Sequence, residues 1–281
     1  MILLADSGST KTEWVLLDAG KQVSIFHTQG ISPLFMDEAT ILEIFKTEVY
    51  PHTTEFNITR VYFYGTGCST EERRNRVKHP LVELMNTKDV FVDHDLMAAA
   101  RALCKDRSGM AAILGTGSNS CLFNGTQIVA NVPSLGFVLG DEGSGAHMGK
   151  ELLRMFVYGE LDKPLHEEVY ETYKLDKEVV LERIYRQPMP GRFAASLVPF
   201  IKKHIHHQQM LQLTGDCFDA FLLRQISKYE GHKELPLHVT GSVGYQFREQ
   251  LEQRAAKAGV SLGLVIRQPM EGLIDYHLQH S

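Results

Sequence analysis

Two Gly-, Ser- and Thr-rich turns with matching surroundings constrain the fold of this chain more than any other feature. The first spans residues 6–12 (Asp-Ser-Gly-Ser-Thr-Lys-Thr) and the second spans residues 114–120 (Leu-Gly-Thr-Gly-Ser-Asn-Ser). Each lies between two short apolar runs, and each is followed by a second tight turn and a third strand-like run. The pattern therefore predicts two three-stranded meanders, and their repetition predicts a chain built from two related halves.

The glycines in these turns suit an anionic ligand. Gly-rich turns expose consecutive backbone N–H groups without side chains in the way, and such groups bind phosphate well. Two facing turns of this kind would hold a polyphosphate between two domains.

Bulk properties narrow the class of protein. The chain has 281 residues, a formal charge of −5 and four cysteines without a C-x-x-C pair. Two domains are therefore expected, and neither a disulfide scaffold nor a zinc ribbon is indicated. The absence of a long Lys/Arg run argues against nucleic acid as a partner. Without a leader pattern or an apolar stretch of about 20 residues, we expect a soluble cytoplasmic protein with no membrane partner.

Strand and helix patterns alternate along the chain, which predicts an α/β class with mixed sheets. Residues 37–49 have helical spacing after a capping Asp37, and short strands are expected at residues 60–64 and 89–92. The polar segment 105–109 is the expected domain boundary. Helices should dominate from Gly145 to about Lys233, and a strand at 237–240 should precede a helix over 245–259.

Asp6 is the first candidate for chemistry because it follows a buried strand and opens a Gly-rich turn. A carboxylate there can hold hydrated Mg²⁺ against bound phosphates. The alternative is an Asx-turn, in which Asp6 caps its own backbone. Thr10, Lys11 and Thr12 add hydroxyl and ammonium donors, although Lys11 is also explained as a solvated turn residue.

Asp95 is the second candidate because it follows a strand and opens an Ala-rich helix. At the carboxyl edge of a sheet it would accept a hydroxyl proton during phosphoryl transfer. The alternative is that Asp95 is only the N-cap of the helix. Asp93 is a rival for either role, and a metal-binding role for the intervening His94 is disfavoured.

Two further motifs have both a functional and a structural interpretation. Residues 140–144 (Gly-Asp-Glu-Gly-Ser) place two carboxylates before a helix. These carboxylates would either bind the hydroxyl groups of a substrate or stabilise the helix by interacting with the positive end of its dipole. We expect Glu142 to support the helix that begins near Gly145. Residues 241–244 (Gly-Ser-Val-Gly) would let backbone approach an adenine closely, or would form an ordinary turn between strand and helix. The histidines at 204, 206 and 207 are expected to form a solvated face.

In this order and spacing, the five motifs at residues 6–12, 92–95, 114–119, 140–144 and 240–244 resemble those of the actin-like ATPase superfamily of sugar kinases, Hsp70 and actin. The chain is most similar to the N-acetylglucosamine kinase branch, grouped with the BadF/BadG-type ATPases. The resemblance covers most of the chain. It implies an α/β fold of two ribonuclease H-like domains, residues 1–106 and 107–281, with a nucleotide cleft between them. The terminal helix would pack back on the N-terminal domain.

The resemblance also implies roles for individual residues. Asp95 would be the general base, and Asp6 would support Mg²⁺. Ser32 stands where such kinases often carry an Asn that contacts the sugar. The residues implied in binding ATP are Gly8, Ser9, Thr10, Lys11, Thr12, Gly115, Thr116, Gly117, Ser118, Gly241, Ser242, Val243 and Gly244, and those implied in binding the sugar are Ser32, Asp95, Asn119 and Asp141.

The expected function is an ATP-dependent kinase that phosphorylates a hydroxyl of an amino sugar, with N-acetylglucosamine as the leading substrate. ATP and Mg²⁺ are the expected cofactors, and a homodimer remains open. The alternative is an ATPase that acts as an activator or sensor by changing its domain angle without phosphorylating a metabolite.

Overall fold

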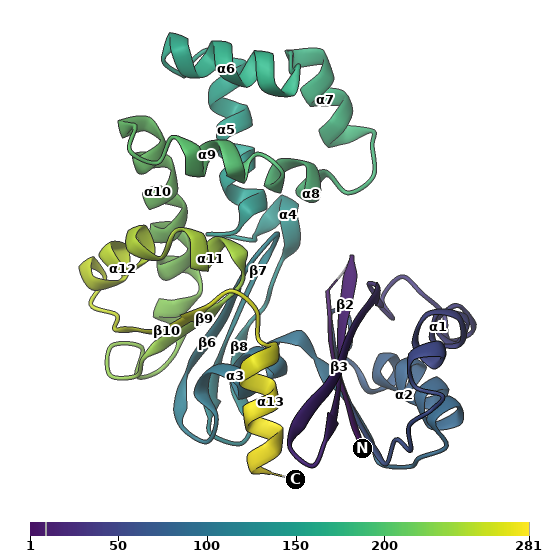
Figure 1. Ribbon diagram of the computed structural model, residues 1–281. Helices are drawn as coiled ribbons and strands as arrows, with labels where there is room; N and C mark the ends of the chain where they lie inside the picture. The colour runs from purple at the N-terminus through teal and green to yellow at the C-terminus, as the bar shows by residue number, and fades with distance from the viewer. Residues whose placement is uncertain (9, 281) are drawn as a thin grey trace. The chain divides into compact units, whose positions relative to one another are not determined.

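The computed structural model of the protein describes residues 1–8 and 10–280. The chain divides into two compact units. The first contains residues 1–105 together with the chain from residue 269 onward, and the second contains residues 106–268. Each unit is an α/β structure with its own five-stranded sheet (Figure 1). The expected α/β class with mixed sheets is therefore confirmed.

The two sheets have the same topology, which confirms the repeat predicted from the sequence. Their orders are β3-β2-β1-β4-β5 and β8-β7-β6-β9-β10. In each, the first three strands in the chain form an antiparallel meander and the last two run parallel to the first. The strands are β1 (Ile2–Ser7), β2 (Lys11–Asp18), β3 (Lys21–Gln29), β4 (Arg60–Gly65), β5 (Val90–His94), β6 (Ser108–Leu114), β7 (Ser118–Asn124), β8 (Ile128–Val132), β9 (Leu237–Thr240) and β10 (Leu262–Ile266).

In the first unit, helices cover both faces of the sheet (Figure 1). On one face Trp14 meets Phe45 edge-on at 5.9 Å and Phe26 in a stack at 6.0 Å, and α1 and α2 close this core. The helical elements are α1 (Glu38–Ile44) with a π-helical continuation η1 (Phe45–Val49), η2 (Tyr50–His52), α2 (Glu71–Met85), α3 (Asp95–Cys104) and α13 (Met270–Gln279). The predicted cap of α1 is confirmed, because the Asp37 carboxylate accepts a hydrogen bond from the N–H of Thr40.

The last helix, α13, packs on the opposite face of this sheet beside α3. The His277 ring stacks on Tyr62 at 3.7 Å, and its Nε2 lies 2.9 Å from the hydroxyl of the buried Tyr64. Arg101 of α3 donates to the same hydroxyl at 2.6 Å. Burial and the nearby Arg101 lower the pKa of His277 to about 3, so its ring is neutral beside the Tyr64 hydroxyl. Side chains from three elements therefore fasten α13 to the first unit.

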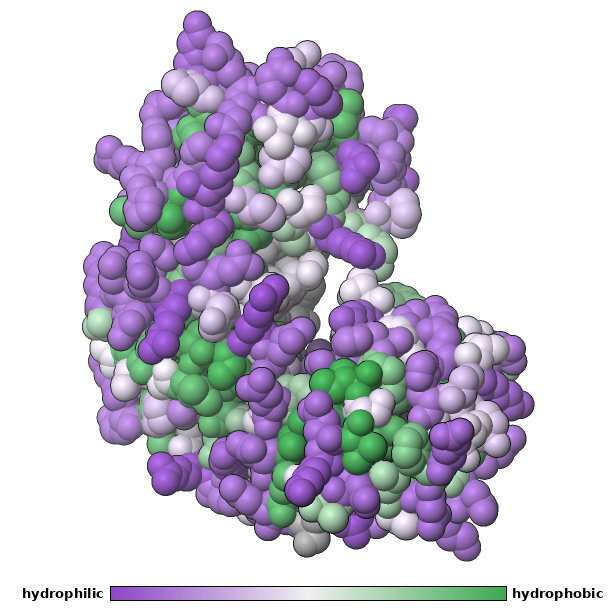
Figure 2. Space-filling model, viewed as in Figure 1, coloured by the Kyte–Doolittle hydropathy of each residue, from purple (hydrophilic) through white to green (hydrophobic). Residues whose placement is uncertain are grey.

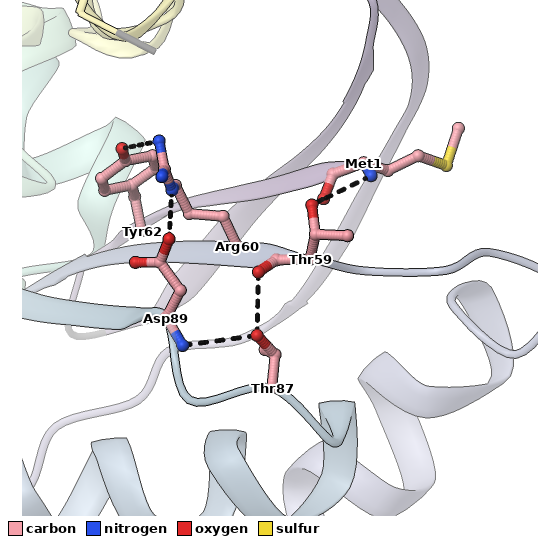
Figure 3. Close-up of polar contacts among 6 residues, drawn as sticks. All are labelled: Met1, Thr59, Arg60, Tyr62, Thr87 and Asp89. Carbon is pink, nitrogen blue, oxygen red and sulfur yellow. Dashed lines mark hydrogen bonds and ion pairs between the residues drawn. The ribbon is translucent and has the colours of Figure 1, made fainter.

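Polar contacts hold the amino ends of β1, β4 and β5 in register (Figure 3). The Thr59 hydroxyl donates to the Met1 carbonyl at 3.1 Å, and the Thr87 hydroxyl donates to the Thr59 carbonyl at 2.8 Å. Arg60 Nε donates to Asp89 Oδ2 at 2.5 Å. The carboxylates described below lie at the opposite edge of this sheet, where the parallel strands β1 and β5 end.

The second unit buries its main core between the sheet and the helices α5, α10 and α12. Its helical elements are α4 (Gly136–Leu139), α5 (Gly145–Tyr158), α6 (Lys163–Tyr173), α7 (Lys177–Tyr185), α8 (Pro190–Ala195), α9 (Val198–Lys203), α10 (Gln208–Arg224), η3 (Ile226–Lys228), α11 (Ser242–Gln246) and α12 (Arg248–Lys257). The prediction of a single helix over residues 245–259 is wrong. Helical structure starts at Ser242 and breaks at Phe247, whose ring is fully buried in the core.

Hydrophilic residues dominate the surface seen in Figure 2, and apolar residues appear there in separate patches. This agrees with the two apolar cores, which take up most of the large hydrophobic side chains. Among the described residues, no helix has both the length and the apolar character needed to cross a membrane.

Candidate active site

Three carboxylates lie at the carboxyl edge of the first sheet. Asp6 is paired with Tyr64 in the register of β1 and β4, and Tyr64 is paired with Asp93 in the register of β4 and β5. Asp95 follows directly as the first residue of α3. Since β1, β4 and β5 are parallel, their carboxyl ends meet at one edge, which is where α/β sheets bind ligands.

His94, and not Asp95, is the N-cap of α3. Nδ1 of His94 accepts a hydrogen bond from the N–H of Met97 at 3.2 Å, so the ring proton is on Nε2, 3.6 Å from Asp93 Oδ1. The interpretation of Asp95 as a mere cap is therefore wrong. Sequence preference favours Asp over His at this position, because Asp is the stronger capping residue in general. Asp95 is left with its carboxylate at the sheet edge and without the capping role.

Burial is the main influence on the Asp95 carboxyl group and raises its pKa. His94 opposes the rise, as do hydrogen bonds from the Leu96 N–H and the Thr66 hydroxyl, which favour the ionised form. A carboxylate in this environment is a stronger base than an exposed one and still has donors that orient it. This combination suits proton abstraction from a hydroxyl group.

The pKa of the Asp6 carboxyl group is raised as well. Burial raises its pKa to about 7, and the negative charges of Asp95 and Glu13 add to the rise. Buried carboxylates of like charge favour a cation in their neighbourhood. Within residues 1–8 and 10–280, no group of three or more His, Cys, Asp and Glu side chains is placed to hold a metal ion. The residues present fit Mg²⁺, which in phosphate sites takes one or two carboxylates and completes its shell with water and phosphate oxygens.

The first Gly-rich turn joins β1 to β2. Gly8, Thr10 and Lys11 are exposed there, and the Gly8 N–H donates to the Lys11 carbonyl at 3.0 Å. Thr12 differs from them: it is fully buried, and its hydroxyl bonds to Ser7 Oγ at 2.7 Å and to the Gln29 carbonyl. The structure therefore gives Thr12 internal partners in the meander. The predicted ligand Ser9 lies outside the described residues.

Ser32 lies on the loop after β3 and is nearly buried. Its carbonyl accepts hydrogen bonds from the N–H groups of Phe35 and Met36, so it closes a tight turn. The β4–α2 loop approaches closely, because a Cβ added at Gly67 would lie 2.8 Å from Ser32 Oγ, and Gly67 has a φ of +84°. A glycine is therefore required at position 67 for the loop to reach Ser32.

The second Gly-rich turn joins β6 to β7 and docks on α5. The Gly115 carbonyl accepts from the Gly145 N–H and the Thr116 carbonyl accepts from the Ala146 N–H, both at 2.9 Å. The first turn of α5 therefore holds two carbonyl groups of this Gly-rich turn. Among the described residues, the N–H groups of Thr116 and Gly117 make no hydrogen bond to a backbone carbonyl. These donors, with the exposed Thr116 hydroxyl, form a surface suited to phosphate.

Asp141 lies under this turn and contacts its backbone. Asp141 Oδ1 accepts from the Ser118 N–H at 3.2 Å, and a Cβ added at Gly117 would lie 3.0 Å from the same oxygen. Asp141 has a φ of +57°, which is uncommon for a residue with a side chain and occurs at functional sites. Burial raises the pKa of Asp141, while the Ser118 N–H opposes the rise. The carboxylate is thus attached to the second Gly-rich turn, a contact that the sequence did not predict.

Glu142 does not support the start of α5, contrary to expectation. Ser144 is the N-cap of α5, and its hydroxyl accepts from the His147 N–H at 3.2 Å. Glu142 instead accepts from Gln225 Nε2 at 3.3 Å and lies 3.7 Å from Arg224. Its partners therefore belong to the end of α10.

The Gly241 turn lies directly beside the second Gly-rich turn. Gly241 has a φ of +116°, and a Cβ there would lie 2.4 Å from the Leu114 carbonyl oxygen. A Cβ at Gly244 would meet Val239 at 2.5 Å and Leu114 at 3.4 Å. Both glycines thus permit close backbone packing at the carboxyl edge of the parallel strands β6 and β9. Ser242 is exposed at this edge, whereas Val243 is buried.

Asn119, which was predicted to bind the sugar, also has a local structural role. The Asn119 amide oxygen accepts from Asn131 Nδ2 at 3.0 Å, which ties β7 to β8. Thr66 supports Asp95, Gln225 supports Ser118 and Tyr229 supports Ser120, and none of these three supporting residues was predicted as part of the site. Only the glycines beside Thr66 gave a signal, because Gly-Thr-Gly at the end of a strand is typical of a functional turn.

Solved structures provide the comparison with known proteins. No family model and no curated protein matches the chain. A "putative N-acetylglucosamine kinase" from Porphyromonas gingivalis is 42% identical over 100% of both chains, with a TM-score of 0.95. A protein of the same description from Chromobacterium violaceum is 16% identical over 98% of both chains, with a TM-score of 0.75. A ROK family glucokinase from Streptomyces griseus, solved with glucose and AMPPNP, is 13% identical over 98% of this chain and 97% of its own, with a TM-score of 0.53.

The last two similarities show the shared two-domain actin-like ATPase fold. The first extends to the sequence over the full length of both chains. The chain therefore belongs to the N-acetylglucosamine kinase-like family within the actin-like ATPase superfamily of sugar kinases.

Proposed function

We propose that this protein transfers the γ-phosphoryl group of ATP to a hydroxyl of an amino sugar, with N-acetylglucosamine as the first substrate to test. Family membership supports sugar kinase activity, and the relative from Porphyromonas gingivalis supports the choice of sugar. The single observation that carries the chemistry is Asp95, a carboxylate of raised pKa at the carboxyl edge of the first sheet whose helix is capped by another residue.

In this proposal Asp95 is the general base. Its carboxylate accepts the proton of the attacking hydroxyl while the hydroxyl oxygen bonds to the γ-phosphorus and the bond to ADP breaks. Phosphoryl transfer depends mainly on positioning and charge neutralisation, so the reaction needs only one base with a raised pKa to accept the hydroxyl proton. Ser32, Asn119 and Asp141 are the proposed contacts to the sugar.

The second unit supplies the proposed nucleotide contacts. The N–H groups of Thr116 and Gly117 would donate to phosphate oxygens, and Ser242 would lie near the adenosine at the adjoining turn. In the first unit, the exposed Gly8, Thr10 and Lys11 would contribute further donors to the phosphates. Asp6 would hold Mg²⁺, which neutralises phosphate charge when bound.

A coupled assay of ADP release tests the proposal. The protein, with Mg²⁺ and ATP, is offered a panel of hexoses, hexosamines and N-acylated amino sugars. We expect ADP release to depend on the sugar and to be fastest with an N-acylated amino sugar. Asp95→Asn is the matched control, because it keeps the shape of the side chain and removes the base. If the rate of ADP release were the same with every sugar as it is without sugar, the protein would instead be a regulatory ATPase.

A further inference from the structure

A buried polar network lies behind the second phosphate turn, where β7 begins. Gln225, between α10 and η3, is 3% exposed and reaches across to two serines of β7. Its Nε2 donates to Ser118 Oγ at 3.1 Å, and its Oε1 accepts from Ser120 Oγ at 3.0 Å. Nε2 also donates to Glu142 Oε2 at 3.3 Å. One side chain therefore links the turn to the acidic motif at residues 140–144.

The chemistry of these contacts requires an amide. Gln225 must accept one hydrogen bond and donate two, and only an amide side chain of this length offers both. A carboxylate would lack the two donors and would bring a second negative charge next to Glu142. An apolar side chain would leave Ser118 and Ser120 without this partner. The position is therefore specified by hydrogen bonding in addition to packing.

Ser118 is held from two directions as a result. Its hydroxyl accepts from Gln225, while its backbone N–H donates to Asp141 Oδ1 at 3.2 Å. It directly follows Thr116 and Gly117, whose N–H groups face the proposed phosphates. A displacement of about 1 Å in a positioning element is enough to reduce catalysis by about 100-fold. The attachment of Ser118 thus controls where the phosphate donors point.

We infer that Gln225 is a positioning residue for the nucleotide, which acts through Ser118 to fix the donors of the second phosphate turn. The inference rests on the proposed function and adds a residue to which that function assigns no role. Gln225 touches neither substrate in this account. Its loss should weaken nucleotide binding and raise the KM for ATP, while the KM for the sugar stays near the wild-type value.

A second arm of the network separates this role from general stabilisation. The Tyr229 hydroxyl lies 2.8 Å from Ser120 Oγ and accepts from the Val132 N–H at 3.1 Å, so it braces β7 without contacting Ser118. Tyr229→Phe should therefore reduce the melting temperature and leave nucleotide affinity intact. Gln250 gives a matched control for the amide, because its buried Oε1 has no hydrogen-bond partner among the described residues.

The test is the dissociation constant of Mg·ADP by calorimetry, in Gln225→Met, Ser118→Ala, Tyr229→Phe and Gln250→Met. Gln225→Met and Ser118→Ala should each raise it by about 5–30-fold, which corresponds to losing one or two buried hydrogen bonds. The other two variants should stay within about twofold of wild type. If Gln225→Met does not fold, Ser118→Ala decides.

Wild-type affinity in folded Gln225→Met, or in Ser118→Ala, would overturn the inference. Equal weakening by Tyr229→Phe would also overturn it, because the effect would then be general destabilisation. A failure of the proposed function is distinguishable: in that case the wild-type protein itself would bind no Mg·ADP or would not phosphorylate a sugar.

Discussion

Replacing Asp6 with Asn should stabilise the ligand-free protein, and the gain should grow with pH. Burial, Asp95 and Glu13 raise the pKa of Asp6 from 3.8 to about 7. The folded state therefore binds the Asp6 proton more tightly than the unfolded state does. Between pH ~4 and ~7 the native protein holds a proton that the unfolded chain has released, so the free energy of unfolding falls as pH rises.

The size of the effect follows from the shift. Each pKa unit corresponds to ~1.4 kcal/mol, so Asp6 costs ~4 kcal/mol above pH ~7, where it is ionised in the folded state, and ~1–2 kcal/mol at pH ~5, where the folded state must keep it protonated. Asn keeps the shape of Asp and does not ionise. The stability advantage of Asp6→Asn should accordingly increase by ~3 kcal/mol between pH 5 and pH 8. Phosphoryl transfer should be lost in the same variant, because Asp6 is the proposed support for Mg²⁺.

Urea denaturation of both proteins at pH 5 and pH 8, without nucleotide or Mg²⁺, measures this difference. Asp18→Asn is the control, since Asp18 is an exposed carboxylate at the end of β2. Its effect should be within ~0.5 kcal/mol of zero at both pH values. An Asp6→Asn advantage that is the same at pH 5 and pH 8 would show that Asp6 ionises normally, and the electrostatic argument for a cation beside it would be refuted.

Four further substitutions test other parts of the site. Asp95→Asn should lower kcat by ~10²–10⁴ in steady-state kinetics and leave Mg·ADP binding almost unchanged. His94→Ala should remove the helix cap and lower the free energy of unfolding by about 1 kcal/mol, as measured by urea denaturation. Gly241→Ala should cost about 2 kcal/mol or more, because its Cβ would meet the Leu114 carbonyl oxygen at 2.4 Å, and calorimetry should show weakened Mg·ADP binding. Asp141→Ala should raise the dissociation constant of Mg·ADP by about 5–30-fold as well as the sugar KM, because its carboxylate holds the Ser118 N–H; unchanged nucleotide affinity would limit Asp141 to the sugar.

The repeated meander could be predicted from the sequence because glycine punctuation and apolar runs are local signals. The same signals located the turns at residues 6–12 and 114–120. Local signals were less informative where tertiary contacts decide the structure. Asp95 has the usual sequence signature of an N-cap, but the preceding His94 takes that role. The backbone at Phe247 breaks a helix that the sequence pattern shows as continuous, because the buried ring is anchored in the core.

The residues that support the site were harder to predict than those that form it. Gln225 lies 107 positions from Ser118 along the chain, and nothing near it in sequence indicates a partner. Asp141 was predicted on the sugar side, and its contact with Ser118 became evident only from the folded backbone. Motifs identify residues that meet ligands, whereas the side chains that hold them in place are set by packing over long sequence distances.

The central claim is that ATP is consumed to phosphorylate an amino sugar. The most direct measurement incubates the protein with Mg·ATP and N-acetylglucosamine and quantifies ADP and sugar phosphate in the same sample by mass spectrometry. We expect one sugar phosphate for each ADP formed, with the rate of formation of both products falling by ~10²–10⁴ in Asp95→Asn. The proposed reaction would be contradicted if ADP formed at the same rate with and without sugar and no sugar phosphate appeared, either from N-acetylglucosamine or from related N-acylated amino sugars.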